Sequence, residues 1–234
     1  QRFFQSLDDR LTRGGPIVTR PAWWSGSVGL TSDVRKPVTV NTGIGANDYD
    51  SGAWDWSAGV SLGLKTSTWW NLTVGPSVTR LYTPAQYLTT VTDPAYTATY
   101  GRRYLFAPLH YTEIGLETRL NMTFSPALSL ETYVQPLLSG GDYGEQRQLV
   151  APRTYDFAPL GADANAYDFN FRSLRGNAAL RWEWRTGSTL YVAWQDGRFR
   201  SSGDAYDIVF STSTNGAQWS EPVRVPLSFG ASYI

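Results

Sequence analysis

The feature that most constrains the fold is an alternation of apolar and polar residues with a period of two. Its clearest instance covers residues 53–66, where one face carries Trp54, Trp56, Ala58, Val60, Leu62 and Leu64. The opposite face carries Asp55, Ser57, Gly59, Ser61, Gly63 and Lys65. Successive side chains of a strand point to opposite sides of a sheet, so this segment is expected to be a strand with one apolar and one polar face. Repeated along a chain, the pattern is typical of a barrel with lipid outside and water inside.

The same alternation predicts further strands over most of the chain. They cover residues 24–30, 38–44, 70–79, 114–124, 128–138, 169–184 and 190–194, with another strand around Tyr104 and Phe106. Short polar connections join most of them, as in an antiparallel meander. Residues 82–100 are expected to form a longer loop or a broken strand pair, and residues 139–167 a long loop on the outer side of a barrel. The predicted fold is all-β: an antiparallel up-and-down transmembrane β-barrel, or part of one, with about 8 to 11 strands.

We expect residues 1–234 to form a single β-barrel domain, since an all-β domain of this size need not be split. Residues 1–21 would be an N-terminal extension or linker, residues 22–200 the barrel strands, and residues 201–234 a hairpin and a closing strand. The sequence starts at Gln1 and shows no signal peptide, so it is expected to be a processed or excised piece of a longer product.

Composition disfavours several classes of function. Twenty basic and twenty acidic residues give a net charge of zero, which leaves no electrostatic footprint for nucleic acid. The chain has no cysteine, which excludes disulfides and thiolate metal sites. Aromatic residues make up 15% of the chain. Membrane barrels need such residues at both interfaces, so this content favours a barrel.

The alternation also selects two sets of candidate site residues. Candidates for lining a lumen are the charged residues on polar faces: Glu113, Glu117, Arg119, Glu131, Arg175, Arg181 and Glu183. Candidates for the membrane interface are Trp24, Trp54, Trp56, Trp70, Trp182, Trp184 and Trp194. The first four charged residues are expected to form an inward ion-pair ladder. Glu113 and Glu117 would lie roughly 13 Å apart along a strand, too far for the carboxylate pair of a glycoside hydrolase.

Catalytic and metal-binding signals are weaker. His110 is the only histidine, so a hydrolase with a Ser/His or Asp/His site would have to use it. Asp48, Asp50 and Asp55 surround Gly52 and offer the oxygens of a calcium loop, yet Asp, Ser and Gly are also the ordinary turn formers. The sequence therefore predicts neither an enzyme nor a cofactor, with calcium at these three aspartates as the weaker alternative.

Three motifs carry a resemblance to a known family. They are residues 13–16 (RGGP) followed by 20–24 (RPAWW), residues 119–126 (RLNMTFSP), and residues 168–175 (DFNFRSLR) followed by 180–185 (LRWEWR). Together they resemble the C-terminal barrel of a bacterial envelope family of unknown function, in which a carbohydrate-binding family 9-like domain precedes the barrel. The resemblance implies an outer-membrane barrel of which this chain is the C-terminal portion. It brings no catalytic motif with it.

The C-terminal tail departs from that family. Residues 206–225 resemble one degenerate sialidase-type Asp-box repeat, but a single copy cannot build a propeller. Asn215-Gly216 is then simply a good hairpin turn. The apolar residues that follow share one face, as in a closing barrel strand: Val223, Val225, Leu227, Phe229, Ala231 and Tyr233.

Three functions from different classes fit these patterns. The first is a non-enzymatic protein of the bacterial outer membrane, structural or porin-like, whose partners are the lipid bilayer and a glycan or another envelope protein. The second is a soluble β-rich carbohydrate-binding module with two packed sheets. The third is a barrel hydrolase that uses His110. Long strands and a polar face rich in Gly, Ser and Thr favour the first.

Overall fold

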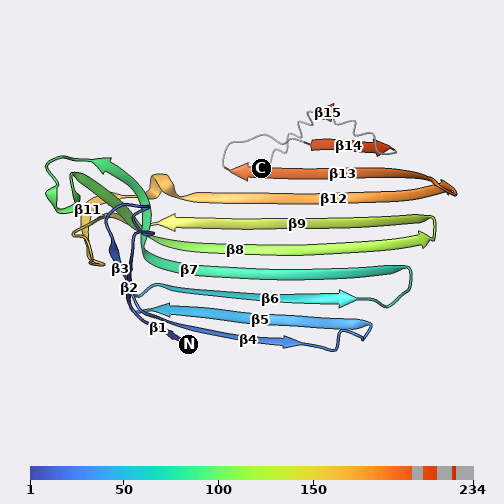
Figure 1. Ribbon diagram of the computed structural model, residues 1–234, viewed down its shortest axis with the longest axis horizontal. Coiled ribbons are helices and arrows are strands. Elements are labelled where there is room, and N and C mark those ends of the chain that lie inside the picture. Colours follow the sequence, from blue (N-terminus) through green and yellow to red (C-terminus); the bar gives the residue numbers. More distant parts are fainter. Residues whose placement is uncertain (202–207, 215–222, 225–234) are drawn as a thin grey trace, which may run out of the picture.

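The computed structural model describes residues 1–201, 208–214 and 223–224, and most of them lie in one antiparallel sheet. Figure 1 shows its strands side by side. In order across the sheet, the main strands are β4 (Trp23–Thr31), β5 (Val38–Tyr49), β6 (Trp54–Leu64), β7 (Trp70–Thr92), β8 (Arg102–Ser125), β9 (Leu128–Tyr143), β12 (Phe169–Arg185), β13 (Ser188–Ser201) and β14 (Ile208–Thr214). At the two edges lie β1 (Arg2–Phe3) beside β4 and β15 (Val223–Arg224) beside β14. The predicted all-β antiparallel meander is confirmed.

The strand register keeps the alternation in phase from one strand to the next. One row of directly opposed residues runs through Val28, Ile44, Ala58, Val78, Ile114 and Leu138. The adjacent row on the other side of the sheet runs through Ser27, Gly45, Ser57, Thr79, Glu113 and Ser139. A slip of one residue would exchange the two faces, so the alternation itself specifies the register.

Two segments expected to be loops are largely strands. β7 continues to Thr92 and pairs with the start of β8, so a loop over residues 82–100 is wrong and the broken strand pair is closer. Register shifts between Thr83 and Gln86 let the pair continue past Pro84, which has no N–H to donate. The expected loop over residues 139–167 is also wrong. β9 extends to Tyr143, and β10 (Glu145–Leu149) and β11 (Phe157–Asp163) follow it. β10 pairs with both β11 and β8, a tertiary pairing that local periodicity does not reveal.

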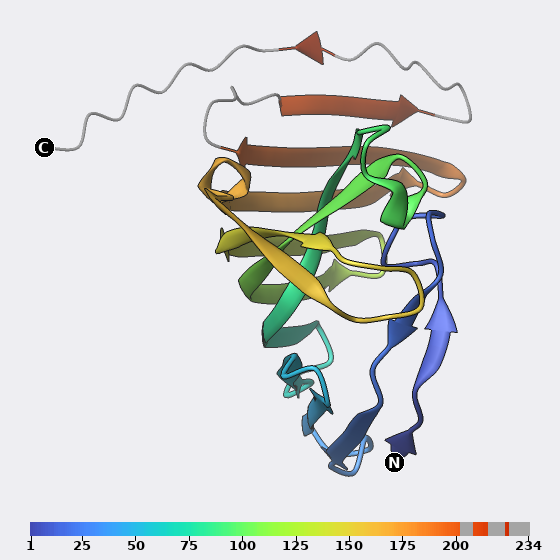
Figure 2. The same cartoon turned by 90° about the vertical axis from the view of Figure 1, so that its left-hand side faces the viewer.

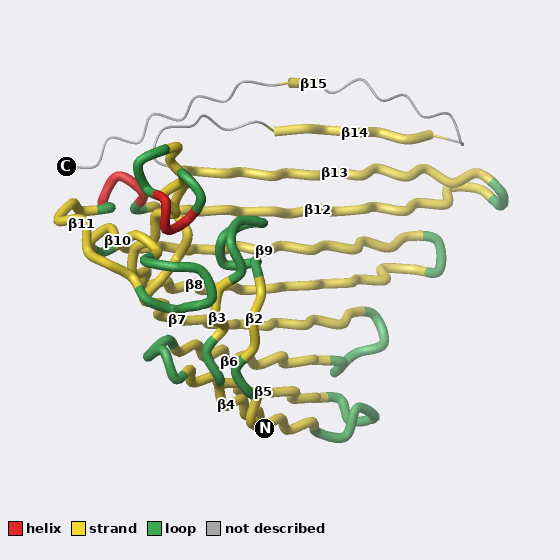
Figure 3. Tube along the Cα trace, turned by 60° about the vertical axis from the view of Figure 1, so that its left-hand side comes forward, coloured by secondary structure: helices red, strands yellow, loops and turns green. Residues whose placement is uncertain are grey.

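A small packed unit closes over one end of the sheet, and we call it the cap: residues 6–20, 84–107 and 144–163. It includes β2 (Ser6–Asp8), β3 (Val18–Arg20), β10, β11 and the 3-10 helix η1 (Thr97–Thr99). It also includes the C-terminal end of β7 and the N-terminal end of β8. Figures 2 and 3 show these elements gathered at one end, with the sheet curving behind them. The buried cluster of the cap contains Val18, Ala85, Tyr104, Phe106 and Leu149. A second 3-10 helix, η2 (Asn165–Tyr167), lies between β11 and β12.

The two edges of the sheet do not pair with each other among the described residues. β4 pairs with β5 along its length but with β1 only at Trp23 and Trp24. Gln1 and Ser25 exchange two backbone hydrogen bonds of 2.7 and 2.9 Å. The outer edge of β4 from Gly26 to Thr31 has no partner strand in the described part of the chain. The expected turn at Asn215-Gly216, and the closing strand beyond Arg224, lie outside the described residues.

Candidate functional site

The candidate functional site is the sheet itself, because its two faces differ in chemistry. We call the side that carries Val28, Val60, Ile114 and Val134 the apolar face, and the side that carries Ser27, Ser61, Glu113 and Arg119 the polar face. Direct cross-strand pairing assigns each residue to its face, since opposed residues lie on the same side of a sheet.

The apolar face is largely exposed in the structure. The exposed fraction is 66% for Val28, 53% for Ile114 and 51% for Leu138, three members of one row on different strands. A soluble β-sandwich buries such a face against a second sheet. In the described residues the second sheet is only the short pair β2 and β3, which belongs to the cap. No described sheet covers this face.

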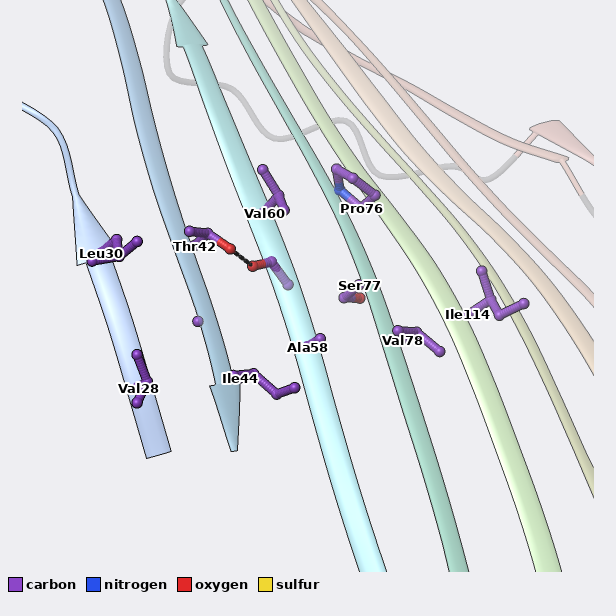
Figure 4. Close-up of a pocket in the computed structure, with 12 residues that line it drawn as sticks. Val28, Leu30, Thr42, Ile44, Ala58, Val60, Pro76, Ser77, Val78 and Ile114 are labelled. Carbon is purple, nitrogen blue, oxygen red and sulfur yellow. Dashed lines mark hydrogen bonds between the residues drawn. The ribbon is translucent and has the colours of Figure 1, made fainter. Parts of the chain in front are cut away.

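The apolar face is hollowed between β4 and β8. Figure 4 shows the hollow, which has a volume of about 510 Å³. Apolar side chains surround it: Val28, Leu30, Ile44, Val60, Val78 and Ile114. Its floor contains the small residues Gly43, Ala58 and Gly59. Thr42 donates its hydroxyl to the Gly59 carbonyl at 3.0 Å, so this hydroxyl is satisfied within the sheet. The hollow therefore offers little polar chemistry.

The seven candidate tryptophans all lie on the apolar face, and six of them lie toward its ends. Trp24, Trp54 and Trp56 are at the capped end, where Trp54 is opposed to Asp48 and Tyr82. At the far end Trp70 is opposed to Met122. There Trp182 and Trp184 make an edge contact with ring centroids 6.4 Å apart. Trp194 departs from this arrangement, because it is opposed to Ala178 midway along the apolar face.

The seven candidate lumen-lining residues all lie on the polar face. Arg119 donates from Nε to Glu117 Oε1 at 2.8 Å, and its guanidinium lies over the Tyr133 ring at 5.0 Å. Arg181 and Glu183 approach to 3.6 Å. Arg175 faces Gln135, and Glu131 faces Ala179 and Asn121.

Of the expected ion-pair ladder, the described residues contain the Glu117–Arg119 pair, whereas Glu113 accepts a hydrogen bond of 2.6 Å from the Tyr111 hydroxyl. Tyr111 was missed by sequence reasoning, which considered only charged partners. Its position two residues before Glu113, on the same face of one strand, is the signal that could have revealed the pair.

The remaining candidates are His110 and the three aspartates of the calcium alternative. The His110 ring packs against Tyr82 with centroids 4.6 Å apart, and it faces Asp142 across the strand pair on the apolar face. No hydrogen bond from a serine to His110 is present among the described residues.

The three aspartates of the calcium alternative point apart. Asp48 lies on the apolar face, whereas Asp55 lies on the polar face and accepts hydrogen bonds from Asn47 at 2.7 Å and Tyr49 at 3.3 Å. Asp50, in the following turn, pairs with Arg2 at 2.6 Å, and this hydrogen bond lowers the pKa of Asp50. The described residues contain no group of three or more His, Asp or Glu side chains that could hold a metal.

None of the described helices has the length and apolar character to cross a membrane. No protein-family model, curated protein or solved structure matches the chain. The resemblance to the bacterial envelope family therefore stays a prediction.

Proposed function

We propose that this chain is a non-enzymatic β-barrel protein of the bacterial outer membrane, with its apolar face toward lipid and its polar face toward water. The observation that carries the proposal is the exposed apolar face, which stays in phase from β4 to β13. A bilayer is the solvent that such a face fits, because hydrocarbon replaces the second sheet that would cover it in water.

The dimensions of the apolar band support the proposal. On β7, Arg80 faces Trp56 near one aromatic end, and Trp70 marks the other end. At the usual rise of a strand these two positions are about 33 Å apart along β7. With the tilt of about 40° that is common in membrane barrels, the band would be about 25 Å tall, which matches the apolar band of outer-membrane proteins.

The polar face supports a watered interior. Its side chains are mostly small or hydroxylated, and several of its charges are paired: Glu117 with Arg119, Glu183 with Arg181, and Glu113 with the Tyr111 hydroxyl. The cap lies over this face, since cap residues Leu11 and Arg13 line the same cavity as Asp55 and Thr79 of the polar face. A structural or porin-like role needs only such an interior and no catalytic group. Its partners would be the lipid bilayer and a glycan or another envelope protein.

A matched pair of substitutions tests the orientation. Val60 and Ser61 are neighbours on β6 and face opposite sides of the sheet. Val60 is 37% exposed, so Val60→Arg should change stability by less than about 0.5 kcal/mol if water bathes the apolar face. In a bilayer the same change places a charge near mid-band and should destabilise the protein by about 2 to 4 kcal/mol. Ser61→Arg is the control and should be tolerated in both cases.

The measurement is chemical unfolding of each variant in phospholipid vesicles, together with membrane fractionation of the expressed protein and gel mobility with and without boiling. We expect the unmodified chain in the outer-membrane fraction and a loss of folded protein for Val60→Arg alone. Equal stability of the two arginine variants in a soluble, detergent-independent protein would refute the membrane proposal.

A further inference from the structure

A cavity of about 590 Å³ lies between the N-terminal part of the cap and the polar face. Its volume is within the usual range for small-molecule sites. The cap contributes Asp8, Arg10, Arg13 and Arg20, and the sheet contributes Tyr49, Asp55, Thr79 and Thr83. It is distinct from the hollow of the apolar face, and no role described above uses it.

Three of the residues that line this cavity are arginines, against two aspartates. None of the three forms an ion pair within the described part of the chain. Arg20 is half-buried, and its guanidinium lies 4.1 Å from the centre of the Trp23 ring. Arg13 lies over the Tyr87 ring at 5.9 Å. Stacking on a ring orients a guanidinium and leaves its N–H groups able to bind an anion.

The two aspartates offset the charge of the three arginines only in part, and both already accept hydrogen bonds from neutral groups. Asp8 accepts the backbone N–H of Arg10 at 3.2 Å. Asp55 is held by Asn47 and Tyr49, which use two of the roughly four acceptor positions of its carboxylate. The remaining positions can accept hydrogen bonds from hydroxyl groups. Thr79 and Thr83 add hydroxyls to the same wall.

We infer that this cavity binds a small carboxylate rich in hydroxyl groups, which is the chemistry of a sugar acid. The carboxylate of the ligand would meet Arg20 and Arg13, because guanidinium groups match carboxylates in charge and in fork geometry. The hydroxyls of the ligand would meet Asp55 and the threonines. The inference goes beyond the proposed function, and it holds whether or not the apolar face contacts lipid.

The test is isothermal titration of the full chain with D-glucuronate, with D-glucose and inorganic phosphate as comparison probes. We expect glucuronate to bind at least tenfold more tightly than either probe. Arg20→Gln should weaken glucuronate binding by tenfold or more, and Arg20→Lys by less. Arg35→Gln is the matched control, because Arg35 is 87% exposed in the β4–β5 turn at the far end of the sheet, and it should bind as the unmodified chain does.

Glucuronate that binds no better than glucose would overturn the inference, and so would unchanged affinity in Arg20→Gln. Equal affinity for phosphate with the same dependence on Arg20 would show a bare anion site and would also contradict it. If Arg20→Gln fails to fold, Arg13→Gln makes the same test from an exposed position, with the same expected loss. Membrane fractionation reports separately on the proposed function, so the two failures can be told apart.

Discussion

At the scale of single residues, the Arg13-Gly14-Gly15-Pro16 motif has a packing explanation. A Cβ on Gly15 would lie 2.6 Å from Cζ and Oη of Tyr104, whose side chain is buried in the cap. Gly14 has a φ of +84°, a conformation that favours glycine. The motif is visible in the sequence, but the need for a glycine at position 15 could not be predicted from it, because Tyr104 is distant along the chain.

Tyr155 provides a test of the cap by pH. Burial raises the pKa of its phenol, which also bonds to Ser51 and Thr83. The folded pKa is above the unfolded value of about 10, so the stabilisation is fully present below pH ~10 and is lost as pH rises through the folded pKa. Tyr155→Phe should therefore reduce the loss of stability above pH 10, measured by chemical unfolding at a series of pH values. Tyr100→Phe, at a side chain that is 78% exposed, should leave that slope unchanged. Identical slopes for both variants would contradict burial of Tyr155.

At the scale of elements, the strands with a clear period were predictable and the cap was not. β6 and the β8–β9 hairpin carry their alternation in consecutive residues, so the sequence indicates both the strands and their faces. β10 and β11 have no such period, because the cap surrounds their residues on several sides. The same limit applies to the cavity arginines, since only the folding of residues 6–20 over the polar face brings them beside Asp55.

The cap core makes its own prediction. Phe106 is fully buried and packs edge-on against Tyr87 and Phe157, with ring centroids 5.8 and 4.9 Å away. Phe106→Ala should lower the free energy of unfolding by about 3 to 5 kcal/mol. It should also speed trypsin cleavage at Arg153, which is exposed but whose backbone bonds to Ile17 and Thr19 within the cap. Phe4→Ala, at a side chain that is 83% exposed, should change stability by less than about 0.5 kcal/mol. Chemical unfolding and limited proteolysis measure both effects. Equal trypsin sensitivity of the two variants would show that Phe106 does not hold the cap closed.

At the scale of the whole molecule, the absence of cysteine permits a direct map of the two faces. Single cysteines at Ser57 and Ser61 should react with a charged, water-soluble maleimide in phospholipid vesicles. Cysteines at Ala58 and Val60, on the same strand, should react only after unfolding in urea, because lipid would shield them. Similar labelling rates at all four positions would contradict a lipid-facing side.

The outer edge of β4 carries backbone groups without a partner strand among the described residues, and a membrane makes this more costly than water does. From Gly26 to Thr31 its outward backbone N–H and C=O groups have no strand to bond among the described residues. In water such an edge is a template for aggregation, whereas in hydrocarbon each unbonded group costs several kcal/mol. In a bilayer, β4 would therefore need a neighbouring strand along Gly26 to Thr31. β1 pairs antiparallel with β4, and Gln1 bonds to Ser25. A neighbour that continued this pairing would also run antiparallel to β4, and every second side chain of it would lie on the lipid-facing side.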